Sequence, residues 1–385
     1  MARERKTVLP GGTIGVLGGG QLGRMLALAG RAMGYRFATL DPTEDSPLGQ
    51  VADEQIVAAY HDADAAKRLA AISDVITYEF ENVDAAVAGM LTSECYVPQG
   101  SELLYTTQHR LREKRAIEAA GVKVAPYREI RSEEELLGAV REFGTPCVLK
   151  TATGGYDGKG QWVIRAESEV PEAYDTLAKA KTELVLEKFI RFEKELSVIA
   201  ARSPRGEIKA FPAAENIHVD NILHLSIVPA RAHADVLAEA EKMAVRIAES
   251  MEAIGLLAVE MFLTADGELF VNELAPRPHN SGHYTMEACR TSQFEQHVRA
   301  ICNLPLGPVE LLTPVVMANV LGEHVAPLLD WMGEEAGLPE GVAAKVHLYG
   351  KHEAKAKRKM GHVNLLTDDV EKAIRWVESS AIWQR

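Results

Sequence analysis

Short apolar runs alternate with amphipathic stretches over roughly the first hundred residues. Thr13–Leu17 is a buried-strand run, and a helical stripe follows it at Leu22, Met25, Leu26, Ala29 and Met33, with Gly34 as the stop signal. Two more strands are predicted at Phe37–Leu40 and Val75–Tyr78. This strand–helix–strand order predicts a doubly wound parallel sheet with helices on both faces.

The middle of the chain has a different pattern. Between Pro146 and Glu273 the apolar runs are separated by glycine-rich turns, which predicts mostly antiparallel strands, at 147–150, 161–165, 183–189 and 195–201. One long helix is expected from about Ala234 to Ile254. The sequence therefore predicts, in this order along the chain, an α/β domain, a large α+β domain and a small C-terminal piece.

Composition and charge narrow the class of protein. The 385 residues include 47% hydrophobic residues and carry a net charge of −13, which excludes a disordered chain and disfavours nonspecific nucleic-acid binding. No run approaches the roughly 20 apolar residues of a membrane span. Four scattered cysteines without a C-x-x-C pair predict neither a zinc site nor a disulfide framework. We therefore expect a cytoplasmic protein.

A glycine motif opens the first predicted helix. Gly18, Gly20 and Gly23 let a ligand approach the backbone at a helix N-terminus, which attracts phosphate. Asp41 ends the second strand, where dinucleotide enzymes bind ribose. Taken alone, the motif leaves three interpretations open: a nicotinamide dinucleotide, another anionic ligand, or a tight strand–helix turn.

A second glycine-rich segment, GGYDGKG at residues 154–160, joins two predicted antiparallel strands. It is not a Walker A loop, because Gly160 stands where Ser or Thr must follow the lysine. Backbone N–H groups of such a loop can surround phosphates, and Lys150 ends the preceding strand within reach of them. We predict a phosphate-binding loop here, with a plain hairpin turn as the alternative.

The segment Glu187–Ile190, followed by Glu195, fits a nucleoside. A strand that becomes a linker offers backbone N–H and C=O groups to an adenine edge, and a carboxylate a few residues later can bind ribose hydroxyls. The alternative is an ordinary surface ion pair, because charged residues are mostly exposed.

The sequence VEMFLTADGELFVNE predicts a hairpin with Asp266-Gly267 as a two-residue loop. That loop places Glu260 directly opposite Glu273, on apolar strands where paired carboxylates repel each other. A divalent cation removes the repulsion, and carboxylates with nucleotide phosphates suit Mg²⁺. Asn272 could complete the ligand set. A shared proton and a solvated edge strand are the alternatives.

The loop after Glu273 resembles a small-anion site. Pro276 and Pro278 prevent a helix, so His279 and His283 are not a helical zinc pair. The loop instead presents four polar side chains beside the predicted metal site: Arg277, His279, Asn280 and Ser281. Arginine is suited to clamping a carboxylate or bicarbonate. A purely structural loop is the alternative.

Basic residues gather near the C-terminus, between Lys351 and Lys359, in an otherwise acidic chain. Such a cluster can bind a substrate phosphate, and Lys351 and Arg358 are the best candidates. The alternative is a set of solvated surface lysines.

These segments, in this order, resemble the ATP-grasp superfamily and, within it, the 5-(carboxyamino)imidazole ribonucleotide synthetases of bacterial purine biosynthesis. The matching stretches are IGVLGGGQLGRMLALAG, TYEFENV, GGYDGKGQ, EKFI, AENIH, VNELAPRPHNSGHYT and KMGHVN. They span roughly residues 13–365. The resemblance implies an ATP-grasp fold with an N-terminal substrate-binding domain (1–105), an ATP-grasp domain (106–310, lid about 122–190) and a C-terminal domain (311–385).

The resemblance also implies an activity. Enzymes of this family join bicarbonate to the amine of 5-aminoimidazole ribonucleotide and split ATP to ADP and phosphate, with a carboxyphosphate intermediate. ATP and Mg²⁺ (or Mn²⁺) are then the expected cofactors, and a homodimer without nucleic-acid or membrane partners is the expected assembly. In this family the first glycine motif serves the substrate and not a dinucleotide.

Site residues follow from the resemblance position by position. ATP is expected at Arg110, Lys150, Gly155, Tyr156, Asp157, Gly158, Lys159, Gly160, Gln161, Glu187, Lys188, Phe189, Ile190, Glu195, His218, Asn272 and Glu273. The ribonucleotide and bicarbonate are expected at Gly20, Gln21, Leu22, Glu79, Tyr156, Asp157, Arg277, His279, Asn280, Ser281, Lys351 and Arg358. Glu260 and Glu273 are the expected metal ligands, and the candidate catalytic residues are Lys150, Asp157, Arg277 and His279.

Three other functions stay open at this point. Another ATP-grasp ligase would share the nucleotide site and differ in its acceptor. A nicotinamide-dependent dehydrogenase would rest only on Gly18–Gly23 and Asp41, and a nucleotide-binding regulator would lack turnover.

Overall fold

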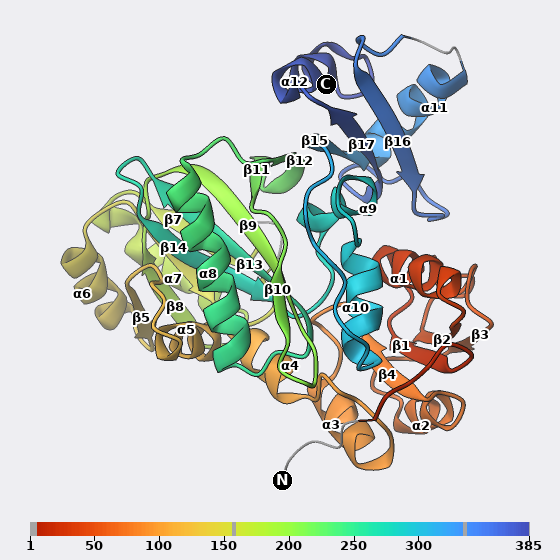
Figure 1. The fold of residues 1–385 in the computed structure, drawn as a ribbon. Coiled ribbons are helices and arrows are strands. Elements are labelled where there is room, and N and C mark those ends of the chain that lie inside the picture. Colours follow the sequence, from red (N-terminus) through yellow and green to blue (C-terminus); the bar gives the residue numbers. More distant parts are fainter. Residues whose placement is uncertain (1–5, 156–158, 334–336, 385) are drawn as a thin grey trace.

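The computed structural model describes residues 6–155, 159–333 and 337–384. It contains three sheets, each in its own part of the chain sequence (Figure 1). An N-terminal α/β unit and a small antiparallel unit flank a large central sheet, and the C-terminal strands extend that central sheet.

The N-terminal unit is a four-stranded parallel sheet in the order β3-β2-β1-β4. Its elements are β1 (Thr13–Leu17), α1 (Gln21–Ala32), β2 (Arg36–Asp41), β3 (Glu54–Val57), α2 (Ala63–Ala71), β4 (Val75–Tyr78), α3 (Ala85–Glu94) and α4 (Glu102–Thr107). The predicted strands and the first helix are confirmed. Gly34 lies just past the end of α1 with a φ of +92°, which favours glycine.

Helices cover both faces of this sheet, as predicted, although one of them comes from far along the chain. Val16 on β1 packs with α1 and with Phe294 and Val298 of α10 (Gln293–Ile301). The opposite face packs against α2 and α3 through Leu69 and Leu91. Helix α10 also contacts β13 and β9, so it joins the N-terminal unit to the central sheet.

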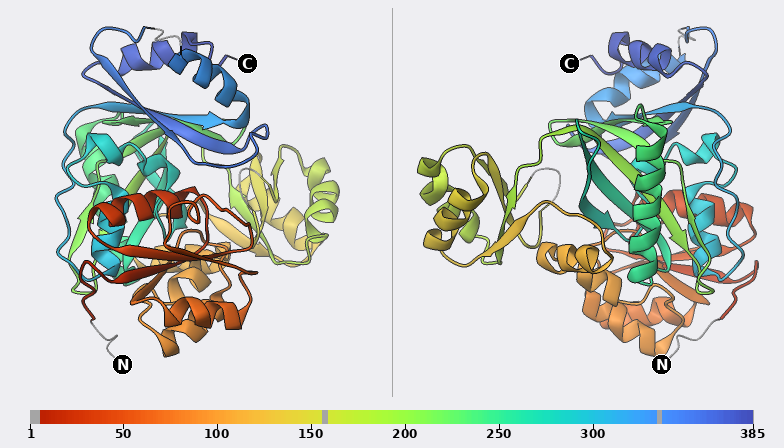
Figure 2. Two further views of the ribbon diagram at one scale, coloured as in Figure 1. Left: turned by 90° about the vertical axis from the view of Figure 1, so that its right-hand side faces the viewer. Right: turned by 60° about the vertical axis from the view of Figure 1, so that its left-hand side comes forward.

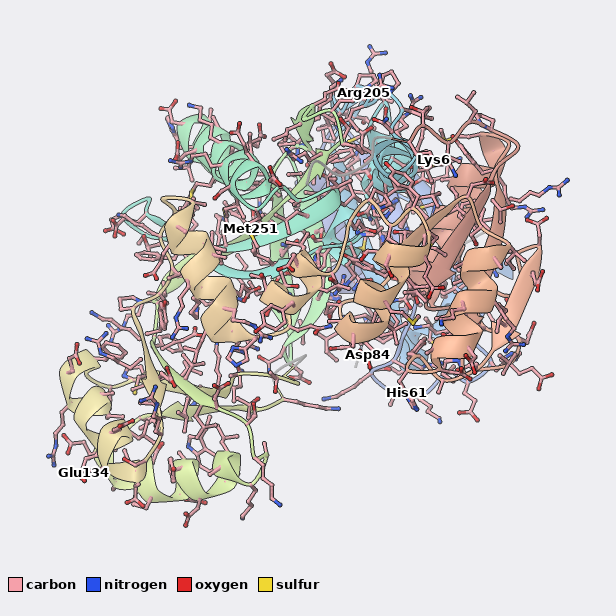
Figure 3. The ribbon with its side chains drawn as sticks, turned by 90° about the horizontal axis from the view of Figure 1, so that it is seen from below. Lys6, His61, Asp84, Glu134, Arg205 and Met251 are labelled. Atoms are coloured by element: carbon pink, nitrogen blue, oxygen red, sulfur yellow. The ribbon has the colours of Figure 1, made fainter. Side chains whose placement is uncertain are left out.

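The lid is a four-stranded antiparallel sheet in the order β5-β8-β6-β7. Its elements, preceded by α5 (Arg110–Ala119), are β5 (Tyr127–Ile130), α6 (Glu133–Phe143), β6 (Cys147–Thr151), β7 (Gln161–Ile164), α7 (Val170–Ala178) and β8 (Leu184–Lys188). It has an apolar core of its own. The lid stands away from the rest of the molecule in two views (Figure 2; Figure 3, where Glu134 marks α6).

The central sheet has nine strands and runs β14-β13-β9-β11-β12-β15-β17-β16, with β10 paired to β9. Its first part comprises β9 (Phe192–Arg202), β10 (Ile208–Ala210), β11 (Ala214–Val219), β12 (Ile222–Val228), α8 (Ala234–Ser250), β13 (Gly255–Thr264), β14 (Leu269–Ala275) and α9 (Thr285–Ala288). Helix α8 ends at Ser250, four residues before the predicted end, because Glu252 adopts a φ of +47° that breaks the helix.

The C-terminal strands are not a separate sheet. This part comprises β15 (Val315–Leu321), α11 (Val325–Gly333), β16 (Val342–Leu348), β17 (Lys359–Thr367) and α12 (Val370–Ser379). Strand β15 pairs antiparallel with β12, so the small C-terminal piece predicted from the sequence continues the central sheet. Among the described residues, no helix is both long and apolar enough to cross a membrane.

Candidate active site

Glu260 and Glu273 lie directly opposite each other on β13 and β14, as predicted. The predicted two-residue loop is wrong, however. Thr264 and Glu268 close a three-residue loop in which Gly267 has a φ of +85°, so the pairs near the tip are shifted by one residue. A β-bulge beside Glu260 inserts one extra residue into β14 and restores the alignment of the two carboxylates.

This carboxylate pair is suited to a divalent cation. Burial raises the pKa of Glu260, and the negative charge of Glu273 raises it further. Within the described residues no third His, Cys, Asp or Glu joins them in a metal-binding cluster. An ion held here would therefore take its remaining ligands from other oxygen groups, such as nucleotide phosphates.

Glu113 is a buried carboxyl group that the sequence analysis missed. Its Oε1 accepts a hydrogen bond of 2.8 Å from the backbone N–H of Leu274, the residue after Glu273. Burial and the charge of Glu273 raise the pKa of Glu113 to about 8. Glu113 thus anchors β14 from α5 immediately behind the carboxylate pair.

The lid contributes a buried ion cluster. Glu187 on β8 lies between two lysines: Lys150 Nζ is 2.9 Å from its Oε2, and Lys114 Nζ is 3.2 Å from its Oε1. Burial opposes ionisation of Glu187, but the charges of Lys150 and Lys114 lower its pKa to about 2. Lys114 on α5 was not predicted, because nothing in the sequence pattern separates it from a surface lysine.

Glu187→Gln is expected to destabilise the fold by about 3–5 kcal/mol at pH 7, because two lysines stay buried without their counter-charge. Since the folded-state pKa lies below the usual 4.5, this stabilisation is present above pH 4.5 and is lost as the pH falls toward 2. Urea unfolding of the variant measures the change. Glu142→Gln, which removes an exposed ion pair with Arg128, is the matched control and should cost at most about 1 kcal/mol.

Arg110 connects the carboxylate pair to the glycine-rich loop of the lid. Its Nη1 lies 3.7 Å from Glu273 Oε2, and its Nη2 would lie 3.3 Å from a Cβ atom added at Gly155. The loop closes through a 2.8 Å bond from Thr151 N–H to Gly160 O, where Gly160 has a φ of +70°. Tyr156, Asp157 and Gly158, three of the predicted site residues, lie outside the described residues.

Residues predicted for the nucleoside lie on both sides of the lid–sheet junction. His218 Nδ1 on β11 is 3.2 Å from Glu195 Oε1 on β9; burial lowers the pKa of His218, but the nearby Glu195 carboxylate outweighs this and raises it. Phe192 stacks on Phe262 at 4.6 Å between ring centroids. Lys188, Phe189 and Ile190 join β8 to β9 and are exposed or half-buried. The N–H of Lys188 already donates to Pro126 O at 2.8 Å, so this group is not available for an adenine edge.

The anion loop, residues 275–283, follows β14 directly. Arg277 forms an ion pair with Glu81, which lies in the loop after β4 of the N-terminal unit. Gln293 of α10 fixes the loop by accepting from His279 N–H at 2.9 Å and donating to His279 O at 2.8 Å. Gly282 packs so closely that a Cβ atom there would lie 2.1 Å from Ile199 and 2.6 Å from Gln293.

His279 faces the carboxylate pair from this loop. Its Nε2 lies 3.4 Å from Glu260 Oε1. Burial and the charge of Arg277 lower the pKa of His279 well below 6.5. Asn280 Oδ1 is 3.2 Å from His283 Nε2, and Ser281 is buried with its hydroxyl group bonded inside the protein. The loop therefore presents Arg277 and His279 to the carboxylates and keeps Ser281 behind them.

The first glycine motif does not hold a dinucleotide phosphate. The Glu79 carboxylate occupies the N-terminus of α1, where it accepts hydrogen bonds from Gly20 N–H and Gly23 N–H. Asp41 accepts from Gly19 N–H at 2.8 Å and from Tyr60 O–H at 2.5 Å. The anion at this helix end is thus the protein's own, which removes the basis for the nicotinamide interpretation.

The neighbours of Glu79 include other predicted substrate residues. Gln21 begins α1 and is half-buried, whereas Leu22 packs its side chain into the core. A ligand could therefore contact Leu22 only through its backbone.

The C-terminal basic cluster lies over this same helix end. Gln50 donates to Gly350 O at 2.8 Å, and His352 Nε2 is 2.9 Å from Asp45 Oδ2. Burial and the charge of Arg358 lower the pKa of Lys351 to about 8, whereas the charge of Glu79 acts in the opposite direction. The structure thus brings Lys351 and Arg358 toward the start of α1.

Lys359 and Glu81 are functional candidates that the sequence analysis did not single out. The charge of Lys359 affects the pKa values of Glu81, His218 and His279, so its ammonium group lies near the reaction site. The sequence does contain a feature that could have pointed to each of these two residues. Glu81 follows Glu79 by two positions, and Lys359 ends the basic cluster where β17 begins.

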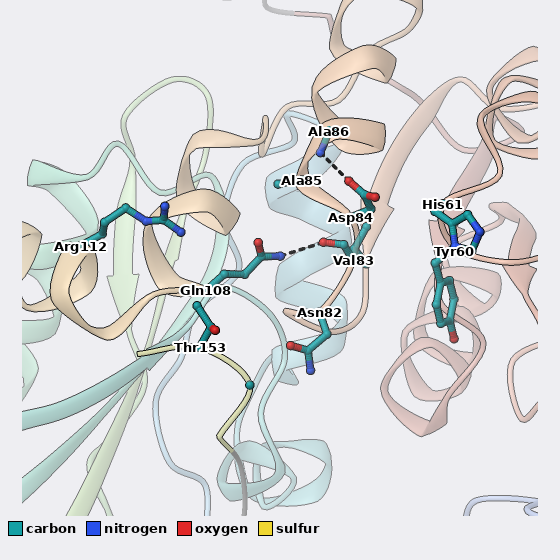
Figure 4. A pocket seen from close by; sticks show the side chains of 11 residues that line it. Tyr60, His61, Asn82, Val83, Asp84, Ala85, Ala86, Gln108, Arg112 and Thr153 are labelled. Carbon is teal, nitrogen blue, oxygen red and sulfur yellow. Dashed lines mark hydrogen bonds between the residues drawn. The ribbon is translucent and has the colours of Figure 1, made fainter. Parts of the chain in front are cut away.

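A cavity of about 630 Å³ adjoins the site (Figure 4). It separates the loop after β4, with Asn82 and Asp84, from Gln108, Arg112 and Thr153 at the base of the glycine-rich loop. The side-chain amide of Gln108 donates a 2.8 Å hydrogen bond to the backbone carbonyl of Val83. Neither the carboxylate pair nor the anion loop lines this cavity, so it borders the site without forming it.

The lid with its glycine-rich loop, the buried Lys150 and the carboxylate pair define an ATP-grasp enzyme. A family model described as the ATP-grasp domain matches residues 115–294. Models of the ribonucleotide synthetase preATP-grasp domain and of the phosphoribosylaminoimidazole carboxylase C-terminal domain match residues 12–108 and 315–375.

Relatives specify the family. An N5-carboxyaminoimidazole ribonucleotide synthase from Bacillus subtilis is 52% identical over 364 residues, which cover 94% of this chain and 93% of the relative. A solved synthetase of the same name, in its ADP complex, has a TM-score of 0.94 at 57% identity and 99% coverage of both chains. The Aspergillus clavatus enzyme, in complex with ADP and 5-aminoimidazole ribonucleotide, has a TM-score of 0.87 at 31% identity, covering 95% of this chain and 96% of that one. The chain belongs to the N5-carboxyaminoimidazole ribonucleotide synthases, ATP-grasp ligases of purine biosynthesis.

Proposed function

We propose that this chain carboxylates 5-aminoimidazole ribonucleotide with bicarbonate, at the expense of ATP, and releases ADP and phosphate. The observation that carries the proposal is the position of Glu260 and Glu273 directly against the loop with Arg277 and His279. This arrangement joins a site for metal-bound phosphates to a site for a small anion. The relative bound to ADP and 5-aminoimidazole ribonucleotide supports the choice of acceptor.

In the proposed reaction a bicarbonate oxygen attacks the γ-phosphorus of ATP, the bond to the β–γ bridging oxygen breaks, and ADP leaves. The product, carboxyphosphate, then transfers its carboxyl group to the amine, which loses a proton as phosphate departs. Lys150, Arg277 and the backbone N–H groups of the glycine-rich loop would stabilise charge on the transferred phosphoryl group. A divalent ion held by Glu260 and Glu273 would supply further positive charge there.

The remaining assignments are part of the same proposal. The ATP, substrate and metal residues are those expected from the resemblance, with Mg²⁺ as the ion and Mn²⁺ as a possible replacement. The four free cysteines fit a reducing cytoplasm, and family membership supports a homodimer. The division at about residues 105 and 310 is retained as the domain organisation.

The direct test is ADP release with ATP, Mg²⁺ and bicarbonate, with and without 5-aminoimidazole ribonucleotide. We expect strong stimulation by the ribonucleotide that disappears when bicarbonate is stripped from the buffer. ADP release that does not respond to this ribonucleotide would refute the proposed acceptor.

A further inference from the structure

A row of buried polar side chains leads from His279 into the central sheet. Four hydrogen bonds, each 2.8 Å long, join His279 Nδ1 to Ser281 Oγ, Ser281 Oγ to Ser197 Oγ, Ser197 Oγ to Asn216 Nδ2, and Asn216 Oδ1 to Ser226 Oγ. Apart from His279, each of these side chains is at most 5% exposed. Buried polar groups are costly unless they are fully paired, so a continuous row calls for an explanation.

The row lies on the face of the sheet that carries the metal-binding candidates. Ser197 on β9 pairs directly with Glu260 on β13, and Ser226 on β12 pairs directly with Asn216 on β11. Because opposed residues share a face, the polar row continues the line of the two glutamates across the sheet. It begins beside the reaction site and ends at Ser226, which is fully buried.

The hydrogen bonds have a direction. The backbone N–H of Ser281, which can only donate, points to His279 Nδ1 at 3.4 Å. The amide of Asn216 donates to Ser197, the hydroxyl of Ser197 donates to Ser281, and the hydroxyl of Ser281 is left to donate to Nδ1. Nδ1 therefore accepts, and the ring proton is on Nε2, which lies 3.4 Å from Glu260 Oε1.

We propose that Ser197, Asn216 and Ser226 are positioning residues that fix the tautomer of His279, so that its Nε2–H points into the anion site. The inference rests on the proposed function for the identity of that anion. His279 then donates a hydrogen bond to an oxygen of bicarbonate and of carboxyphosphate, and it does not take a proton from either. A fixed donor needs no reorientation when charge develops on these oxygens.

The orientation of the Asn216 amide controls the direction of the whole row. A carboxylate in its place can only accept, so Ser197 would donate to it and no longer to Ser281. Ser281 would then donate to Ser197 and accept from His279, which favours a proton on Nδ1, although the backbone N–H of Ser281 still opposes it. Asn216→Asp thus keeps nearly the same side-chain shape and reverses the donor–acceptor direction of the hydrogen bonds from Ser197 to Ser281. Ser197→Ala removes the middle of the row and should give a mixture of tautomers.

The tautomer can be observed directly in long-range ¹H–¹⁵N spectra of ¹⁵N-histidine-labelled protein without substrates, with the His279 signals assigned by their loss in His279→Asn. We expect an Nε2–H ring in the wild type, and a mixture with the Nδ1–H ring in both variants, with the larger Nδ1–H share in Asn216→Asp. The KM for bicarbonate should rise about tenfold in both variants, the usual effect of groups that orient a site residue, while the KM for ATP stays within about twofold.

Ser203→Ala is the matched control. Ser203 is equally buried just beyond the same strand, and its hydroxyl group has no hydrogen-bond partner among the described residues. An Nδ1–H ring in the wild type would overturn the proposal, as would a Ser197→Ala protein that matches Ser203→Ala in both spectrum and bicarbonate KM. If Asn216→Asp does not fold, the spectrum of the wild type and the comparison of Ser197→Ala with Ser203→Ala still test the proposal. The spectra need no turnover, so a wild-type enzyme without bicarbonate-dependent ADP release would refute the proposed function alone.

Discussion

Glu273→Gln is expected to lower turnover by about 10³-fold at saturating ATP, the upper end of the effect of one electrostatic group in a reaction site. The amide keeps the shape of the side chain and removes one of the two facing charges that make this part of the sheet a cation site. The metal-free variant should unfold no more easily than the wild type, because the repulsion with Glu260 is relieved. A loss of activity without a loss of stability separates this effect from misfolding.

Thermal melts with ADP, with and without Mg²⁺, supply a measurement that does not depend on turnover. Mg²⁺ should raise the Tm of the wild type and leave that of Glu273→Gln unchanged. Since the pKa of Glu260 is raised, a proton competes with the cation, and the Mg²⁺ affinity of the wild type should weaken as the pH falls below that raised pKa. Glu268→Gln, on the same hairpin and paired with Lys123 at the surface, is the control and should behave as wild type. Near-normal turnover of Glu273→Gln at limiting Mg²⁺ would contradict the metal assignment.

Arg277→Ala is expected to raise the KM for bicarbonate by about 10²-fold and to lower turnover by a similar factor, with little change in the KM for ATP. Arg277 is the cation of the anion loop, and the truncation also leaves Glu81 without its partner. Burial opposes ionisation of Glu81, and the charge of Arg277 lowers its pKa, so the variant should carry a more basic Glu81 carboxyl group. Initial rates over a range of bicarbonate concentrations measure the effect.

The double variant Arg277→Ala/Glu81→Gln separates two causes of this loss. If the unpaired Glu81 charge repels bicarbonate, the second substitution restores much of the activity; if the guanidinium itself binds the anion, it restores little. We expect little recovery. Arg277→Lys should recover only part of the activity, because an ammonium group lacks the two-pronged geometry that matches a carboxylate-like anion. Unchanged bicarbonate dependence in Arg277→Ala would remove this residue from the anion site.

Local signals were sufficient for most of the fold. Strands such as Val75–Tyr78 and Thr13–Leu17 were predicted to the residue, because continuous apolar runs bounded by turn residues depend little on their surroundings. The end of α8 was missed by four residues, since the apolar stripe continues to Ile254 after the backbone has turned at Glu252. The packing of α10 on the N-terminal sheet has no local signal, because its partners lie more than 200 residues away.

The carboxylate pair shows how a prediction can be right for an incomplete reason. The pattern of the hairpin placed Glu260 opposite Glu273 through a two-residue loop, and the structure has a three-residue loop with a compensating bulge. Bulges depend on the tertiary surroundings of a strand, so counting from the turn cannot reveal them. Glu113 was missed for a related reason, since a glutamate inside a charged helix looks exposed until β14 is packed against it.

By itself, the sequence determined the order of the elements and the kinds of residue that gather for ATP-grasp chemistry: glycine loop, lysine, paired glutamates and the arginine–histidine loop. These are short motifs whose meaning lies in residue type and spacing. Only the tertiary structure decided which polar groups remain available to bind a ligand and which are already bonded within the protein. It showed that Glu79 fills the helix N-terminus that looked like a dinucleotide site, and that Ser281 lies behind His279 instead of beside it. Hydrogen bonds between residues distant in the chain leave no spacing pattern in the sequence, so only the folded structure reveals them.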